Sequence, residues 1–225
     1  MYVPATSAQP AAPATMMPLA ADVEIATGGS SPGMAGLAGL GATSAHDSFA
    51  VRRPVLNVLT DHRSTIAGVL RPGLAGRLVT LQALGARGWS TLASTHTGRA
   101  GRFRLRYTPH RAGSERVRLR FAGDASDPGA RRALGRLNVY RLAGASWYGG
   151  GGGLACGGEL TSATMGVANK TLPCGSQVTL RYGDRTVRVR VIDRGPYVAG
   201  REFDLTEATK RALGFGDTGQ VWSTR

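Results

Sequence analysis

From about residue 55 to residue 142 the chain alternates apolar and polar side chains in short stretches, and turn residues separate these stretches. Such alternation is typical of β-strands that have one buried and one solvated face. Turns such as Arg71-Pro72-Gly73 and Arg99-Ala100-Gly101 divide the pattern into seven strands, which indicates a β-sandwich. The predicted strands are residues 56–59, 65–70, 78–83, 89–93, 103–107, 117–121 and 137–140.

The strand pattern continues beyond residue 142, and there it leads into an acid. Valine occupies every second position from Val187 to Val191, with arginine between, which predicts a half-buried strand. The strand ends at Asp193, and Gly195-Pro196 forms a rigid turn behind it. A carboxylate held in this way can act as a catalytic acid, or it can only bond the amides of the turn. We favour catalysis.

The remaining positions predict a hairpin, a short helix and a closing strand. A turn at Gly183-Asp184 joins two strands, and the apolar positions of the helix share one face up to Gly214, which ends it. Asp204 is the expected N-cap, because Glu207 follows it three residues later. The first strand of the hairpin covers residues 178–182, the helix covers residues 205–213 and the closing strand covers residues 220–222.

Residues 1–51 show neither the period of two that is typical of a strand nor the period of 3.6 that is typical of a helix. They are rich in Ala, Pro, Gly, Ser and Thr, which predicts a disordered tail or linker. We therefore divide the chain into this tail, a β-module at residues 52–142 and a second β-domain at residues 143–225. No stretch is long and apolar enough to span a membrane.

The formal charge of +14 is concentrated in the β-module. Residues 52–142 contain 18 arginines and four acids, and many of the arginines occupy outward positions of the predicted strands. A module of this kind can bind an anionic polymer such as a teichoic acid. We do not expect nucleic acid as a partner, because no helix-turn-helix, zinc-ligand or aromatic RNA-binding pattern accompanies the arginines.

Cysteine and histidine give no sign of a metal site. Cys156 and Cys174 have no Cys or His companion in their region, and the four histidines stand singly within the first 142 residues. We expect no metal and no organic cofactor. The two thiols could be free and buried, or they could form a disulfide, which would imply an oxidising location.

Residues 101–124 (GRFRLRYTPHRAGSERVRLRFAGD) resemble the bacterial immunoglobulin-like (Ig-like) modules of surface proteins. The resemblance implies a sandwich that serves as a spacer or adhesive stalk, and it says little about activity. One alternative function follows from it, a structural adhesin in which this module does the binding.

Four motifs in residues 143–225 resemble the double-psi β-barrel of rare lipoprotein A, a fold that expansins and barwin-like proteins share more distantly. They are ASWYG (145–149), ANKTLPCG (168–175), VRVIDRGPYVAGREFDLT (189–206) and ALG (212–214). The resemblance implies a six-stranded barrel and a disulfide between Cys156 and Cys174. The predicted fold class is therefore all-β, with an Ig-like sandwich followed by a double-psi β-barrel that carries a short helix.

Proteins that resemble rare lipoprotein A act on peptidoglycan as lytic transglycosylases. They cleave the glycan between N-acetylmuramic acid and N-acetylglucosamine and leave 1,6-anhydro ends. The resemblance makes Asp193 the catalytic acid and Glu159 its supporting carboxyl. Asn169 stands where the family has a histidine, and we expect it to orient the carboxyl or the substrate. Without a local imidazole, Asp193 would make both proton transfers, first as general acid and then as base.

Other candidates have both a functional and a structural interpretation. Glu159 can instead be a solvated loop acid, and Asp204 can be a helix cap or a second acid that faces the groove. Trp147 and Tyr148 can stack on sugar rings or close the end of the barrel. Two further residues, Arg194 and Tyr197, flank the acid, and we expect them to bind substrate.

We expect a secreted or cell-envelope protein, although residues 1–50 show no signal peptide; a start upstream of Met1 would supply one. Its partners would be peptidoglycan glycan strands and, through the basic module, anionic wall polymers, and it would act as a monomer. The main alternative is a non-catalytic, expansin-like module that binds or loosens cell-wall glycan. Asn169 at the histidine position favours that alternative.

Overall fold

The computed structural model describes residues 48–225. The predicted disordered tail, residues 1–51, lies outside the described residues except at its end. There Phe49–Val51 forms strand β1, so the prediction was wrong for these three residues. The reason is the Phe49 side chain, which is 1% exposed and belongs to a hydrophobic core.

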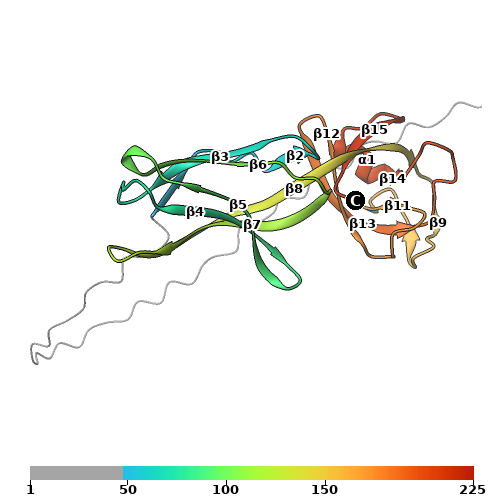
Figure 1. Ribbon diagram of the computed structural model, residues 1–225. Helices are drawn as coiled ribbons and strands as arrows, with labels where there is room; N and C mark the ends of the chain where they lie inside the picture. Colours follow the sequence, from blue (N-terminus) through green and yellow to red (C-terminus); the bar gives the residue numbers. More distant parts are fainter. Residues whose placement is uncertain (1–47) are drawn as a thin grey trace, which may run out of the picture. The chain divides into compact units, whose positions relative to one another are not determined.

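The first β-region is a sandwich of two sheets, which Figure 1 shows with β3 and β6 above β4 and β7. One sheet has the order β1–β3–β6, and the other has β5–β4–β7–β8 with β2 beside β8. A short 3-10 turn precedes β6. The bounds are Asn57–Leu59 (β2), Ser64–Leu70 (β3), Leu78–Gly85 (β4), Gly88–His96 (β5), Arg99–Gly101 (3-10 turn), Arg102–Tyr107 (β6), Gly113–Gly123 (β7) and Pro128–Tyr148 (β8).

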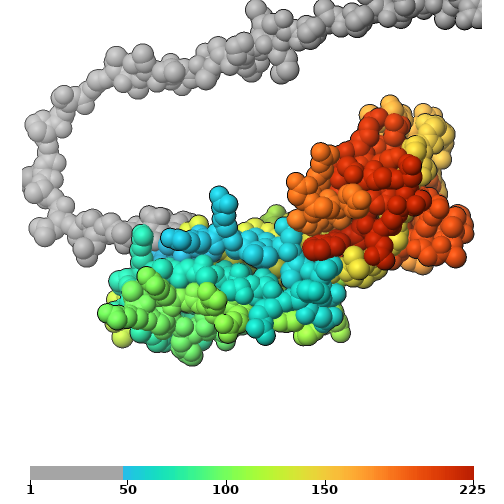
Figure 2. All heavy atoms as spheres, turned by 90° about the horizontal axis from the view of Figure 1, so that it is seen from above, coloured from blue at the N-terminus to red at the C-terminus, as the bar shows by residue number. Residues whose placement is uncertain are grey.

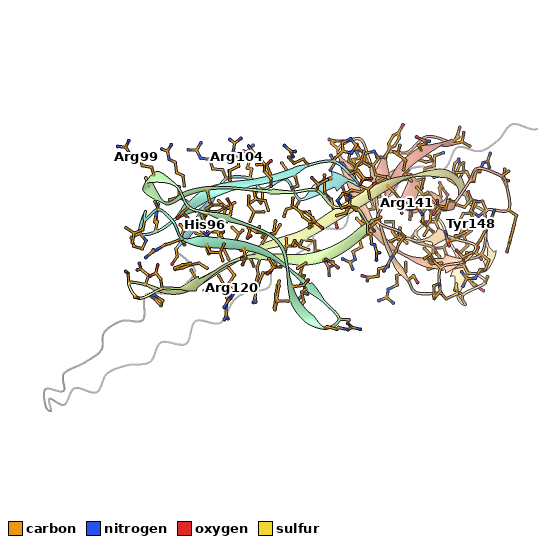
Figure 3. The ribbon with its side chains drawn as sticks, in the orientation of Figure 1. His96, Arg99, Arg104, Arg120, Arg141 and Tyr148 are labelled. Carbon is orange, nitrogen blue, oxygen red and sulfur yellow. A yellow bond between two sulfur atoms is a disulfide. The ribbon has the colours of Figure 1, made fainter. Side chains whose placement is uncertain are left out.

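The core of the sandwich consists of the inward positions of these strands. On β6, Phe103 and Leu105 are buried, and the arginines that alternate with them are exposed, because successive side chains of a strand point to opposite sides. All seven predicted strands are present. Figure 3 shows Arg104 projecting from the outer side of the first sheet and Arg120 from the outer side of the second, and Arg99 projecting from the 3-10 turn before β6.

The second β-region is a closed six-stranded barrel, as predicted. Its strands follow in the order β8–β14–β11–β13–β12–β15, and β15 pairs with β8 to close the ring. The pairs β8–β14 and β11–β13 are parallel, and the expected hairpin joins β12 to β13. Val167, Leu180, Val191, Phe203 and Leu205 lie in its core. The bounds are Val167–Ala168 (β11), Gln177–Tyr182 (β12), Arg185–Asp193 (β13), Phe203–Thr206 (β14) and Thr218–Ser223 (β15). Outside the barrel, Gly152–Gly153 (β9) and Glu159–Leu160 (β10) form a separate two-stranded sheet.

Helix α1 (Glu207–Leu213) follows β14 directly. Its N-cap is Thr206 and not Asp204 as predicted, and the Thr206 side chain accepts a hydrogen bond from the Thr209 N–H. The prediction was wrong because β14 continues to pair with β8 as far as Thr206, which leaves Asp204 inside the strand. Gly214 ends the helix as expected, in the left-handed conformation at φ 66°. Within residues 48–225, no helix has the length and apolarity that a membrane span requires.

Strand β8 belongs to both β-regions. It is 21 residues long, and it pairs with β7 and β2 along its first part and with β15 and β14 along its last part. Tyr140 is fully buried where the partners change, and its ring centroid lies 5.7 Å from that of Trp222 in β15. The expected division between residues 142 and 143 falls within this strand. That division and the Ig-like assignment of the sandwich stay predictions.

Gly144 in β8 should be a position where a single methyl group destabilises the fold. A Cβ atom there would lie 2.0 Å from the carbonyl oxygen of Gly200, so the loop that follows Asp193 would have to move. We expect Gly144→Ala to lower the free energy of unfolding by about 1–3 kcal/mol, measured by urea denaturation.

Gly153→Ala is the matched control, since nothing lies within 4 Å of a Cβ atom at that position. It should change the free energy of unfolding by less than about 0.5 kcal/mol. Equal losses in the two variants would contradict the close approach of the loop to β8.

Candidate functional site

Asp193 is the last residue of β13 and is partly exposed. Its Oδ1 accepts hydrogen bonds from the backbone N–H groups of Ala155 (2.9 Å) and Arg194 (2.8 Å). Gly195 follows at φ 124°, a conformation that glycine adopts far more readily than other residues, so the chain turns away directly behind the acid. Main-chain donors therefore hold the carboxyl, and solvent can still reach it.

The Tyr148 hydroxyl lies beside this carboxyl. Burial raises the pKa of the Tyr148 phenol well above its usual range, and the charge and hydrogen bonding of Asp193 and the charge of Asp204 raise it further. The hydroxyl is enclosed, and among residues 48–225 it has no hydrogen-bond partner at good geometry. A phenol that keeps its proton next to a carboxylate can donate a hydrogen bond to it.

Asp204 lies near Tyr148 because strand β14 pairs with strand β8. Asp204 lies opposite Ser146 in the β14–β8 ladder, and the Ser146 hydroxyl donates a hydrogen bond to its carboxylate. Ser146 and Tyr148 stand two positions apart on β8, so they share one face of the strand. Sequence reasoning missed Ser146, and this spacing from Tyr148 is the signal that could have found it.

The expected disulfide between Cys156 and Cys174 is present. It joins the loop that carries Ala155 to the turn before β12. The Cys156 N–H also donates to the carbonyl oxygen of Ile192 (3.2 Å), so this loop is attached to β13 directly beside the acid. Sequence reasoning missed Ala155, because a backbone donor leaves no trace in the side-chain pattern.

Asn169 is 3% exposed, and its side chain bonds to the main chain. Its Oδ1 accepts from the N–H groups of Thr171 (3.0 Å) and Leu172 (2.8 Å), and its Nδ2 donates to the carbonyl oxygen of Glu202 (3.0 Å). Both lone pairs of the amide oxygen are therefore used. Its backbone N–H donates to the carbonyl oxygen of Asp193 (3.1 Å), so an orienting effect on the acid would act through the main chain.

Arg194, Glu159 and Tyr197 differ in what they contact. Arg194 donates from its guanidinium to the carbonyl oxygens of Asn169 (3.0 Å) and Leu172 (2.8 Å), so it connects the end of β13 to the segment 169–172. Glu159 is exposed at the start of β10, on the same loop as Ala155. Tyr197 is 80% exposed and follows the Gly-Pro turn, which leaves its ring accessible to a ligand.

Trp147 is 37% exposed and belongs to a small polar cluster. The Lys210 ammonium lies 3.8 Å from the centroid of its ring, and its Nε1 donates to Asp217 (2.9 Å). Hydrogen bonds from Lys210 and from Trp147 lower the pKa of Asp217. A sugar ring could therefore stack only on the face of Trp147 that Lys210 does not cover.

The described part of the chain brings Asp193, Tyr148 and Asp204 together. Two carboxylates beside a protonated phenol can transfer a proton and stabilise positive charge on a substrate. Within residues 48–225, no group of three or more His, Cys, Asp or Glu side chains could hold a metal ion.

Comparisons with known proteins concern the same part of the chain. Residues 142–222 match a family model described as lytic transglycolase. The chain is 42% identical over 87 residues to the endolytic peptidoglycan transglycosylase RlpA of Pseudomonas aeruginosa, which covers 36% of this chain and 26% of that protein. It is 41% identical over 80 residues to RlpA of Neisseria meningitidis, covering 33% of this chain and 34% of that protein.

The match to these curated relatives spans only about a quarter to a third of their length. Among solved structures, the Streptomyces papain inhibitor aligns at a TM-score of 0.32 and 24% identity, over 38% of this chain and 94% of that one. The C-terminal part of the chain, residues 142–222, is an RlpA-like double-psi β-barrel.

Removing the disulfide should weaken the attachment of the Ala155 loop. The two cysteines are 18 residues apart, and we expect the double variant Cys156→Ser/Cys174→Ser to lose about 2–4 kcal/mol of unfolding free energy. Urea denaturation without reductant measures this loss. Reductant should bring the unmodified protein to the value of the variant and leave the variant unchanged. A variant as stable as the oxidised protein would contradict the proposed role of the disulfide in attaching the Ala155 loop.

Tyr148 should make the fold sensitive to alkaline pH. Its pKa in the folded state lies above the unfolded value of 10.0, so only the unfolded state releases the proton as the pH rises past 10. The free energy of unfolding should therefore be at its full value below pH 10 and fall above it. Tyr148→Phe should make this fall shallower, measured by urea denaturation at a series of pH values.

Some alkaline sensitivity should remain in Tyr148→Phe, because burial also raises the pKa of Tyr107 and Tyr140. Tyr197→Phe, which removes an exposed phenol, is the matched control. If it flattens the profile as much as Tyr148→Phe does, the effect does not come from the enclosed hydroxyl.

Proposed function

We propose that the RlpA-like barrel of residues 142–222 is a lytic transglycosylase that cleaves peptidoglycan. It cuts the glycan between N-acetylmuramic acid and N-acetylglucosamine and leaves 1,6-anhydro ends. The single observation that carries the proposal is an accessible carboxyl, Asp193, held by main-chain donors in a barrel that matches the lytic transglycolase family model. The names of the curated relatives support the same reaction.

Asp193 makes both proton transfers in this proposal. In its protonated form it donates a proton to the glycosidic oxygen while the bond from that oxygen to C1 of the muramyl residue breaks. The C6 hydroxyl of the same sugar then bonds to C1 and gives its proton back to Asp193. No water is consumed, and the enzyme returns to its starting state.

Neighbouring groups assist the acid. Tyr148 keeps its phenolic proton near the Asp193 carboxylate, where the O–H dipole stabilises the negative charge between the two transfers. Asp204 adds negative charge at the same place, which favours the oxocarbenium-like centre. Glu159 is the supporting carboxyl on the neighbouring loop, and Asn169 positions the main chain of Asp193.

Substrate contacts come from the exposed residues around the acid. Tyr197 has the accessible ring on which a sugar can stack, and Trp147 offers one free face. Arg194 borders the substrate while its guanidinium braces the turn at Leu172.

The protein acts outside the cytoplasm, in the cell envelope, and as a monomer. A structural disulfide persists in an oxidising compartment, and peptidoglycan lies there. Anionic wall polymers are the second partner, bound through the basic sandwich, because residues 52–142 carry a net charge of +14, equal to that of the whole chain.

The alternative is a non-catalytic, expansin-like module that binds and loosens cell-wall glycan. The observation in its favour is Asn169, a buried amide that cannot transfer a proton and stands where the family has a histidine. Retention on insoluble peptidoglycan without release of soluble fragments would select this alternative.

Asp193→Asn tests the enzyme. The full chain is incubated with glycan strands that lack stem peptides, and anhydro-ended products are measured by mass spectrometry. We expect Asp193→Asn to lose roughly a hundredfold or more of the rate, because an amide cannot act as general acid.

Asp184→Asn, in the exposed turn between β12 and β13, is the matched control and should keep full activity. Equal product from Asp193→Asn and the unmodified protein would remove Asp193 from the mechanism.

A further inference from the structure

Three arginines of β6 form a regular row on the outer face of the sandwich. Arg102, Arg104 and Arg106 are exposed and stand at alternate positions, so neighbouring side chains start about 7 Å apart. Within residues 48–225, none of the three guanidinium groups forms an ion pair or donates a hydrogen bond to the protein. Figure 3 shows Arg104 pointing away from the sheet.

An open groove of about 730 Å³ lies beside Arg102 and Arg104 of this row, and Arg52 also lines it. Small side chains of the neighbouring strands also line it. On β3, Val69 lies opposite Arg102 and Ala67 lies opposite Arg104, and Ala50 of β1 lies opposite Val69. Figure 2 looks onto this side of the sandwich, where the atoms of residues 50–110 are blue to green. The groove thus combines an apolar floor with cationic walls.

The floor of the groove is rigid. Phe103, between the two arginines, turns inward and is 5% exposed, and its ring packs edge-on against Phe49 with centroids 6.0 Å apart. Gly68 makes room for that ring, because a Cβ atom there would lie 2.8 Å from it. A ligand would therefore meet a preformed surface.

Among residues 48–225, no acid forms an ion pair with these three arginines. The acids of residues 52–142 lie elsewhere: Asp124 and Asp127 pair with the buried Arg77, Asp61 pairs with His110, and Glu115 belongs to β7 of the other sheet. The other sheet is also basic, but its arginines are more engaged. The Arg118 guanidinium, for example, stacks 3.9 Å from the centroid of the Trp89 ring and donates to Gln82 (3.0 Å).

We propose that the groove beside Arg102 and Arg104, together with Arg106 as the next arginine of the row, is a binding site for a polyol-phosphate polymer. Guanidinium groups bind phosphate through paired N–H donors, and the carbon segments between phosphates would lie on the alanine and valine floor. The repeat of such a polymer is comparable in length to two residues of a strand, which matches the arginine row. Nucleic acid fits less well, because the disulfide indicates an oxidising compartment and the groove offers no aromatic platform for bases.

The inference rests on the proposed location in the cell wall and not on the cleavage reaction. The sandwich would hold the barrel on a wall polymer while the barrel acts on glycan. Loss of polymer binding and loss of glycan cleavage can therefore be measured separately.

The test measures binding of fluorescently labelled poly(glycerol phosphate) to the full chain by anisotropy at several salt concentrations. The triple variant Arg102→Ser/Arg104→Ser/Arg106→Ser should bind roughly tenfold or more weakly, because three exposed charge pairs are lost. The slope of the logarithm of its binding constant against the logarithm of the salt concentration should also become shallower, by the amount that corresponds to about three phosphate contacts. Its cleavage of purified, polymer-free glycan should equal that of the unmodified protein.

The matched control is Arg116→Ser/Arg120→Ser/Arg131→Ser, which removes the same charge from β7 and β8 on the other sheet. This control should lose less than about threefold in affinity. Equal losses in the two triple variants would mean that net charge alone attracts the polymer, and would overturn the site.

Ala67→Gln tests the floor without changing charge. It should weaken binding severalfold and leave the salt dependence unchanged, whereas unchanged affinity would contradict the groove. Single-stranded DNA of equal charge serves as competitor. If it binds as tightly as poly(glycerol phosphate), the specificity for polyol phosphate is wrong.

Discussion

The hydrogen-bonded ladder along β8 is the constraint on which both β-regions depend. The strand pairs with β7 and β2 in the sandwich and with β15 and β14 in the barrel. Because the barrel closes through β8, the end of the strand sets Ser146 and Tyr148 against Asp204. A shift of one residue in its register would turn every side chain to the opposite face, so the sandwich core and the candidate site would fail together.

The candidate site is held mainly by the main chain. Asp193 accepts from the N–H groups of Ala155 and Arg194, and the Asn169 side chain bonds to the main chain at Thr171 and Glu202. The disulfide at Cys156 fixes the loop that provides one of these donors. In residues 48–225 no cation pairs with the Asp193 carboxyl, so it can meet a substrate without first losing a salt bridge. This arrangement fixes the position of the carboxyl that the proposed reaction uses as acid and base.

Local patterns predicted much of the fold, because burial of one strand face leaves a period of two in the sequence. The alternation in β6 placed its arginines outward, and Gly214 was recognised as the end of α1. Arg77 breaks the rule: it is 5% exposed and pairs with Asp124 and Asp127 from the β7–β8 connection, a partnership that spans about fifty residues of sequence. No local window contains that information.

The sequence by itself determined the all-β class, the faces of the strands, and Asp193 as the acid at a strand end, since each follows from residues close together in the chain. The resemblance to rare lipoprotein A added the barrel and the disulfide. Only the tertiary structure decided that Asp204 lies in a strand beside Ser146, that the Asn169 amide bonds to backbone, and that the Ala155 N–H holds the acid. These contacts join distant segments or use backbone donors, which every residue except proline carries and which therefore leave no sequence signal.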